Sequence, residues 1–186
     1  RIRPQAGAIV GALAAVAGYL VTLVLVVAVD SDYVSQSLLP EVGQLFYSAM
    51  FIQMHRPAPG GPESAAGVSG YDGTYNALLD AGRSQVFAIP TPVYHAIPVV
   101  VFLLAGFALA RIASARTPLD GALAGGSAAF GAAAFALLGT LAFASDIGQP
   151  PFFMTVIVGG FVYPGALGAA GGAARPLLAR VRTGRE

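Results

Sequence analysis

Four long apolar stretches dominate the chain, and charged residues are excluded from most of their length. They run over about residues 6–29, 90–113, 119–145 and 151–181. Each stretch reaches the roughly 20 residues that an α-helix needs to cross the hydrocarbon core of a bilayer. The pattern therefore predicts an all-α integral membrane protein that forms a single membrane domain with four transmembrane helices.

Residues 30–85, between the first and second stretches, have a different pattern, with most of the acidic residues and a Pro/Gly cluster. Within them, about residues 38–54 place apolar side chains at helical spacing. The polar positions on the other side are Glu41, Gln44, Ser48 and Gln53. The continuous apolar run, residues 45–54, is too short to cross a bilayer. This segment is predicted to be an amphipathic helix that lies at the interface or against the bundle.

The second half of this loop carries turn signals at Gly70, Asp72-Gly73 and Gly82. Between them, the sequence is compatible with a short hairpin or with a short helix around residues 76–79, and both alternatives stay open. An ordered loop is expected on the outer side of the membrane.

The arginines give the orientation. With four crossings, both termini share one side with most of the basic residues, and only Arg56 and Arg83 fall on the other. The arginines on the terminal side are Arg1, Arg3, Arg111, Arg116, Arg175, Arg180, Arg182 and Arg185. The positive-inside rule then predicts a multi-pass protein of the plasma membrane with both termini cytoplasmic. A fifth crossing at residues 38–54 would split the arginines between the two sides, so four crossings are preferred.

Composition supports the membrane class. Hydrophobic residues make up 56% of the chain and charged residues 10%, whereas a soluble domain usually has about a quarter charged residues. Cysteine is absent, which excludes disulfides and thiolate metal sites. The first apolar stretch is longer than the core of a signal peptide and no small-x-small site precedes Asp30, so it is interpreted as a retained anchor helix.

Small residues recur on the faces of the apolar stretches, where they allow close contact between helices in lipid. The predicted helix-packing positions are Gly7, Gly11, Gly18, Gly121, Gly125, Gly159, Gly160, Gly168 and Gly172. One interpretation is packing within the four-helix bundle. The other is that one Gly/Ala face remains for a partner helix, in a homo-oligomer or with another membrane subunit.

Few residues of the chain are candidates for catalysis or for binding a metal or cofactor. The two histidines, His55 and His95, are weak candidates for a metal or bis-histidine haem site, because such a site requires them to converge. Without convergence, His95 is an interfacial residue near a helix start and His55 ends the amphipathic helix. No cofactor is predicted. No nucleophile with its base, zinc motif or phosphate-binding loop is present, and no basic-aromatic patch, so neither an enzyme nor a nucleic-acid partner is predicted.

A transporter or channel would be expected to carry ionisable residues within its spans, and the four stretches hold none at mid-depth. The sequence Tyr163-Pro164-Gly165 could break the last helix and free carbonyls for an ion. A proline kink cushioned by neighbouring glycines is the simpler interpretation.

Three segments carry a resemblance: "GYLVTLVLV" in the first span, "FYSAMFIQMHRP" in the loop and "GGFVYPGALGAAGG" in the last span. With these, the chain resembles an uncharacterised haloarchaeal family of four-span membrane proteins, a domain of unknown function. The resemblance implies an archaeal plasma membrane and an outer loop exposed to high salt, as in a halophile. It implies no activity, ligand or catalytic residue.

The sequence therefore predicts a non-catalytic accessory or scaffold subunit of a larger membrane assembly, held in the lipid bilayer and packing through Gly/Ala-rich helix faces. The alternative is a small transporter or channel module with a broken last helix. A third hypothesis is a haem- or metal-carrying redox subunit.

Overall fold

The computed structural model describes residues 4–33, 37–57, 71–81, 87–145 and 148–183. As predicted, four helices in this part of the chain are long and apolar enough to cross a membrane. The first is α1 (Pro4–Ala28) and the second is α4 (Thr91–Ile112). The third joins α5 (Pro118–Gly126) to α6 (Ala128–Ala142), and the fourth joins a π-helix, η2 (Met154–Val162), to α7 (Tyr163–Thr183).

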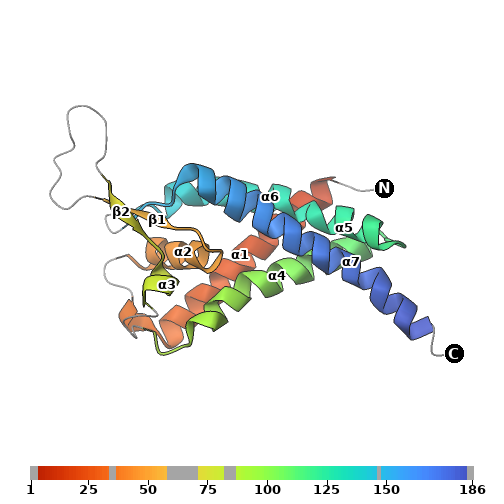
Figure 1. The fold of residues 1–186 in the computed structure, drawn as a ribbon, viewed down its shortest axis with the longest axis horizontal. Coiled ribbons are helices and arrows are strands. Elements are labelled where there is room, and N and C mark those ends of the chain that lie inside the picture. The colour runs from red at the N-terminus through yellow and green to blue at the C-terminus, as the bar shows by residue number, and fades with distance from the viewer. Residues whose placement is uncertain (1–3, 34–36, 58–70, 82–86, 146–147, 184–186) are drawn as a thin grey trace.

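The four long helices form one bundle in which α1 packs on α6 and α4, and α7 packs on α5 and α4. The start of α1 and the end of α7 lie at the same end of the bundle (Figure 1). Alanines such as Ala15 and Ala132 fill the interior, while Leu13, Val24 and Leu141 are 63%, 64% and 79% exposed. Small residues inside and large apolar residues outside are what helix packing in lipid favours, because the bulky side chains have no water to avoid.

The helices approach one another through glycine. Gly106, Gly125 and Gly168 meet where α4, α5 and α7 come together, and a Cβ on any of them would lie under 3.0 Å from a backbone atom of another helix. The same holds, against backbone or side-chain atoms of this chain, at every predicted helix-packing position: Gly7, Gly11, Gly18, Gly121, Gly125, Gly159, Gly160, Gly168 and Gly172. These glycines pack within the chain, so a partner helix would have to use other residues.

The opposite end of the bundle carries a small structure that we call the cap, made of α2 (Leu38–Ala49), β1 (Met54–Pro57), β2 (Tyr71–Tyr75) and α3 (Ala77–Ala81). A short 3-10 helix, η1 (Ser31–Tyr33), follows α1. The strands β1 and β2 are antiparallel and pair Met54 with Tyr75 and His55 with Thr74. The prediction of an all-α fold is therefore wrong at this end. Of the two alternatives left open for the second half of the loop, the short helix occurs as α3, whereas the strand β2 pairs with β1, which lies earlier in the loop.

The amphipathic helix predicted over about residues 38–54 is shorter in the structure, and its polar side is buried. The helix ends at Ala49, and residues 54–57 form a strand instead. Every residue from 41 to 50 is buried, and Glu41 and Gln44 are only 4% and 1% exposed. The physical reason is that the rest of the cap and the residues after α6 cover this polar side and supply its hydrogen-bond partners. Thus α2 lies within the end of the bundle.

Candidate functional site

Gln44 is the centre of the hydrogen bonds that join the cap to the bundle. Its Nε2 donates to the backbone oxygens of Phe143 and Gly148, at 2.8 and 2.9 Å, and to the hydroxyl of Ser145 at 2.9 Å. Its Oε1 accepts from the hydroxyl of Tyr75 at 2.8 Å. Burial raises the pKa of Tyr75 above its usual value, so this hydroxyl remains a donor at neutral pH. One amide therefore ties α2 to the end of α6 and to β2.

Asp30 makes a second connection, from the end of α1 to the start of α4. Its carboxylate is 3% exposed and accepts hydrogen bonds from the hydroxyl of Tyr94 and the backbone amides of Ala88 and Ile89. A carboxylate just after a helix C-terminus meets the negative end of the helix dipole, so it needs donors from elsewhere. The segment that enters α4 supplies them and is thereby fixed against α1.

Asn76 completes the connections at the junction of β2 and α3. Its Oδ1 accepts from the amides of Leu78 and Leu79, both at 3.0 Å, as an N-cap does. Its Nδ2 donates to the backbone oxygens of Ser48 and Ile52, at 3.1 and 3.2 Å. Because Ser48 belongs to the last turn of α2, one side chain satisfies the end of one helix and the start of another.

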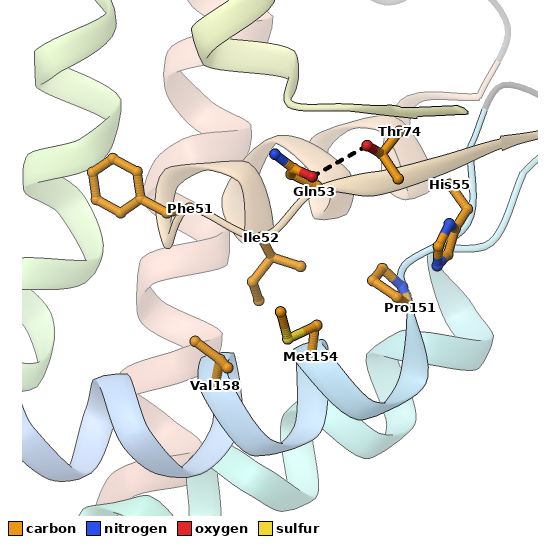
Figure 2. Close-up of a pocket in the computed structure, with 8 residues that line it drawn as sticks. All are labelled: Phe51, Ile52, Gln53, His55, Thr74, Pro151, Met154 and Val158. Carbon is orange, nitrogen blue, oxygen red and sulfur yellow. Dashed lines mark hydrogen bonds between the residues drawn. The ribbon is translucent and has the colours of Figure 1, made fainter. Parts of the chain in front are cut away.

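A pocket of about 410 Å³ lies between the cap and the π-helix η2. The residues that line it are Phe51, Ile52, Gln53, His55, Thr74, Pro151, Met154 and Val158. Figure 2 shows Met154 and Val158 on η2 facing the cap residues, with Phe51 and His55 at opposite ends of the pocket. The hydroxyl of Thr74 donates to Oε1 of Gln53 at 3.1 Å and joins the two strands along this wall.

Phe51 forms one end of the pocket with an uncommon backbone conformation. Its φ is +63°, in the left-handed region that favours glycine, and such a conformation is unusual for an aromatic residue. The backbone hydrogen bonds from Phe51 to Ser48 and from Ile52 to Tyr47 form the helix-ending motif that requires it. The ring stacks on His95 with centroids 4.6 Å apart, which offsets part of the strain.

The two predicted metal candidates have different partners. His95, in the first turns of α4, donates from Nδ1 to the backbone oxygen of Ala49 at 2.9 Å and so caps the end of α2. His55 lines the other end of the pocket from Phe51, and its backbone pairs with that of Gln149 in an isolated bridge. Among the described residues, no group of three His, Asp or Glu side chains could hold a metal ion.

The predicted helix break falls at a change of helix type. Tyr163 is the first residue of α7, and its backbone amide donates to the oxygen of Val158, five residues back, as in a π-helix. Pro164 has no amide to donate, and its ring would clash with the oxygen of residue 160 in a regular α-helix. The wider turn of η2 relieves this clash, so Tyr163-Pro164-Gly165 continues the helix and does not interrupt it.

Thr155, in the first turn of η2, is fully buried, and its Oγ1 has no hydrogen-bond partner in the part of the chain that the structure describes. We expect Thr155→Val to raise the free energy of unfolding by about 1–2 kcal/mol, because a buried unsatisfied hydroxyl costs about 1–3 kcal/mol and valine has nearly the same shape. The measurement is reversible unfolding in mild detergent. In the control, Thr22→Val, the lost hydroxyl donates to the oxygen of Gly18 at 2.9 Å, so stability should fall. The prediction is wrong if both variants lose stability.

Sequence reasoning missed the residues that form these connections. It places Asp30 only after the first span, and Gln44 only on the polar side of an amphipathic helix. The available signals were a carboxylate at the unfavourable end of a helix and an Asn directly before a short helical pattern, at Asn76. What the sequence could not indicate is which partners these groups reach, because Gln44 and Phe143 are 99 positions apart.

Comparison with known proteins gives one match. The model of a family described as a family of unknown function, DUF7978, matches residues 1–179 of the chain. No curated protein and no solved structure shows a significant match. The haloarchaeal source implied by the sequence resemblance stays a prediction.

Proposed function

Because the chain belongs to DUF7978, a family of unknown function, we propose its role from its own geometry. That role is a non-catalytic accessory or scaffold subunit of a larger membrane assembly, which presents the cap to a partner protein. The observation that carries the proposal is the attachment of the cap to the bundle by hydrogen bonds from buried side chains. Gln44 and Tyr47, which are 1% and 0% exposed, make these bonds from α2 to the backbone oxygens of Gly148 and Ala136. Asn76, which is 3% exposed, joins α2 to α3 within the cap.

A cap that is fixed to the bundle in this way is better suited to binding a partner protein than to transport. A transporter needs polar or ionisable groups at mid-membrane and a part that can move. Among the side chains that the structure describes, the four long helices carry His95 and Arg111 near the two ends of α4 and Asp120 in the first turn of α5. Arg175 lies within α7, where its guanidinium reaches the end of α4. The hydroxyls of Ser127 and Thr140 donate to carbonyls of their own helices. These features of the bundle interior favour a rigid scaffold that holds the cap.

The same proposal places the protein in the membrane. We infer that the bundle crosses the bilayer, with the start of α1 and the end of α7 in the cytoplasm and the cap outside. Arg175 supports this orientation, because its Nη1 donates to the oxygens of Ala110 and Ala115, at 3.2 and 2.9 Å, at the C-terminal end of α4. A cation at the C-terminus of α4 is favourable there, and basic residues accumulate on cytoplasmic ends.

Site-specific photo-crosslinking in native membranes tests the scaffold role. A photoreactive residue at Leu79, which is 51% exposed on α3, should crosslink to one discrete protein. The matched control is the same residue at Leu141, which is 79% exposed on α6 and should contact lipid. A full-length protein that gives no crosslinked partner from Leu79, and that migrates as a lone monomer after mild solubilisation, would contradict the proposal.

A small transporter or channel module is the second candidate, and the π-helix η2 is the observation in its favour. Segments of π-helix occur frequently at functional sites, and η2 is nine residues long whereas most such segments are single turns. Its position next to Tyr163-Pro164-Gly165 agrees with a hinge in the last helix. Ion or solute flux in reconstituted vesicles, lost on Pro164→Ala, would favour this candidate over the scaffold. The redox subunit has no comparable observation in its favour.

A further inference from the structure

The pocket between the cap and η2 has one wall of mixed polar and apolar side chains and one apolar wall. The first wall comes from β1, β2 and the residues just before β1, which we call the hairpin, and its lining residues are Phe51, Ile52, Gln53, His55 and Thr74. Met154 and Val158, on the other wall, come from a helix long enough to cross the membrane. Figure 2 shows Ile52 facing Met154 and Val158, with the hydrogen-bonded pair Gln53 and Thr74 farther from η2. An occupant that matches both walls must therefore be amphipathic.

The apolar wall continues onto surface that faces outward from the bundle. Phe152 and Phe153, at the start of the last helix, are 61% and 69% exposed, and Met154 is 53% exposed although it also lines the pocket. With the bundle in a bilayer, as proposed above, these side chains face hydrocarbon near the head-group level. The pocket is thus open towards the lipid, and a lipid can enter it sideways.

We propose that this pocket binds a membrane phospholipid. The ester and phosphate oxygens of the head group lie at the hairpin wall near Gln53 and Thr74, and one hydrocarbon chain lies along Met154 and Val158. The volume of about 410 Å³ is within the usual range for ligand pockets, about 300–1,000 Å³. It accommodates a glycerol-ester region with part of one chain, so the second chain remains in the bilayer.

The walls are built to hold their shape. Cδ1 of Ile52 occupies the space that a Cβ on Gly159 would fill, so the hairpin inserts directly against the backbone of η2. At the end of the pocket, Phe51 keeps its left-handed φ of +63° and stacks on His95. Backbone strain and π-helical turns both concentrate at functional sites, where the surrounding structure maintains them. Here both occur at the same pocket.

Tryptophan fluorescence tests the proposal directly, because the chain contains no tryptophan. A Phe51→Trp reporter in the otherwise native full-length chain would be titrated in dodecyl maltoside with phosphatidylcholine that carries brominated chains. We expect quenching that saturates near one lipid per protein. A Leu141→Trp reporter, on the exposed face of α6, should be quenched only in proportion to the share of lipid in the micelle. A Thr74→Trp reporter serves if Phe51→Trp does not fold.

Two variants of the same helix show whether the pocket is the site. Val158→Phe fills the pocket and should abolish the saturable quenching, whereas Val162→Phe, on an exposed position of η2 outside the pocket lining, should leave it unchanged. Equal behaviour of the Phe51→Trp and Leu141→Trp reporters would overturn the proposal, and so would equally strong quenching by a brominated alkane without a head group. Quenching of Leu141→Trp in vesicles of the brominated lipid tests membrane insertion separately. A failure of the lipid-binding proposal can therefore be distinguished from a failure of the proposed membrane insertion.

Discussion

Gly125→Ala should lower the free energy of unfolding by about 3 kcal/mol, although alanine is normally the better residue in a helix. A methyl group at this position would lie under 3.0 Å from the backbone of Gly168 on α7 and 3.1 Å from Cα of Gly106 on α4. Both neighbours are backbone atoms, which cannot rotate away as a side chain can. The helices α4, α5 and α7 would have to separate along their shared contact, and the close packing that stabilises helices in lipid would be lost.

The adjacent residue provides the control. Gly126→Ala makes the same chemical change in the same helix, but the new methyl group would lie 3.6 Å from the oxygen of Gly165, an ordinary contact. Its stability should be unchanged or should rise by up to about 1 kcal/mol, from helix propensity alone. Thermal unfolding in mild detergent, followed by far-ultraviolet circular dichroism, should separate the two midpoints by roughly 6–12 °C. Equal midpoints would mean that α5 and α7 do not approach this closely.

The elements that the sequence predicted well are those in which one physical requirement controls a long segment. An uninterrupted apolar stretch of the length of α1 is typical of a membrane-spanning helix, so the number of long helices follows from hydropathy. The glycines follow from a related requirement, since close helix approach leaves no room for a Cβ at positions such as Gly11 or Gly172. Neither prediction depends on knowing which distant residues meet.

The cap could not be predicted in the same way, because its conformation depends on tertiary partners. The segment around α2 has the periodicity of an amphipathic helix, and periodicity alone cannot show whether water or other protein groups satisfy the polar side. Here the side chains of Gln44 and Ser48 find buried partners in the oxygen of Phe143 and the amide of Ala77, so the polar side faces inward. The end of α2 is also unexpected locally, because Phe51 occupies a position where glycine is usual.

The pocket also depends on tertiary contacts, so it could not be predicted from the sequence. Its two walls come from segments about a hundred residues apart, Ile52 and Gln53 on one side and Met154 and Val158 on the other. None of these residues carries a motif, and the strongest local signal, Pro164, lies outside the pocket lining. The π-helix η2, which ends just before Pro164, supplies Met154 and Val158 to this wall. The site thus has no sequence signature.

Gln44→Leu should have the largest effect of any single change in the cap, a loss of about 4 kcal/mol in the free energy of unfolding. Leucine has a similar volume but cannot hydrogen-bond, so the oxygen of Phe143 and the hydroxyl of Tyr75 would lose the amide of Gln44 as their partner. The oxygen of Gly148 would keep only its bond from the amide of Ser145. Each buried group left without a partner costs about 1–3 kcal/mol. Members of one network also weaken together, so the loss should exceed that of any one bond.

Two further variants separate the network from a local effect. Tyr75→Phe removes one hydrogen bond of the network and should cost about 1 kcal/mol, and Gln53→Leu, at an exposed position, should change stability by less than about 0.5 kcal/mol. Hydrogen–deuterium exchange should show faster exchange in residues 71–81 of Gln44→Leu, while α1 and α4 stay protected. A loss for Gln44→Leu no larger than that for Tyr75→Phe would mean that apolar contacts hold the cap. The rigid attachment that supports the scaffold proposal would then have no basis in this network.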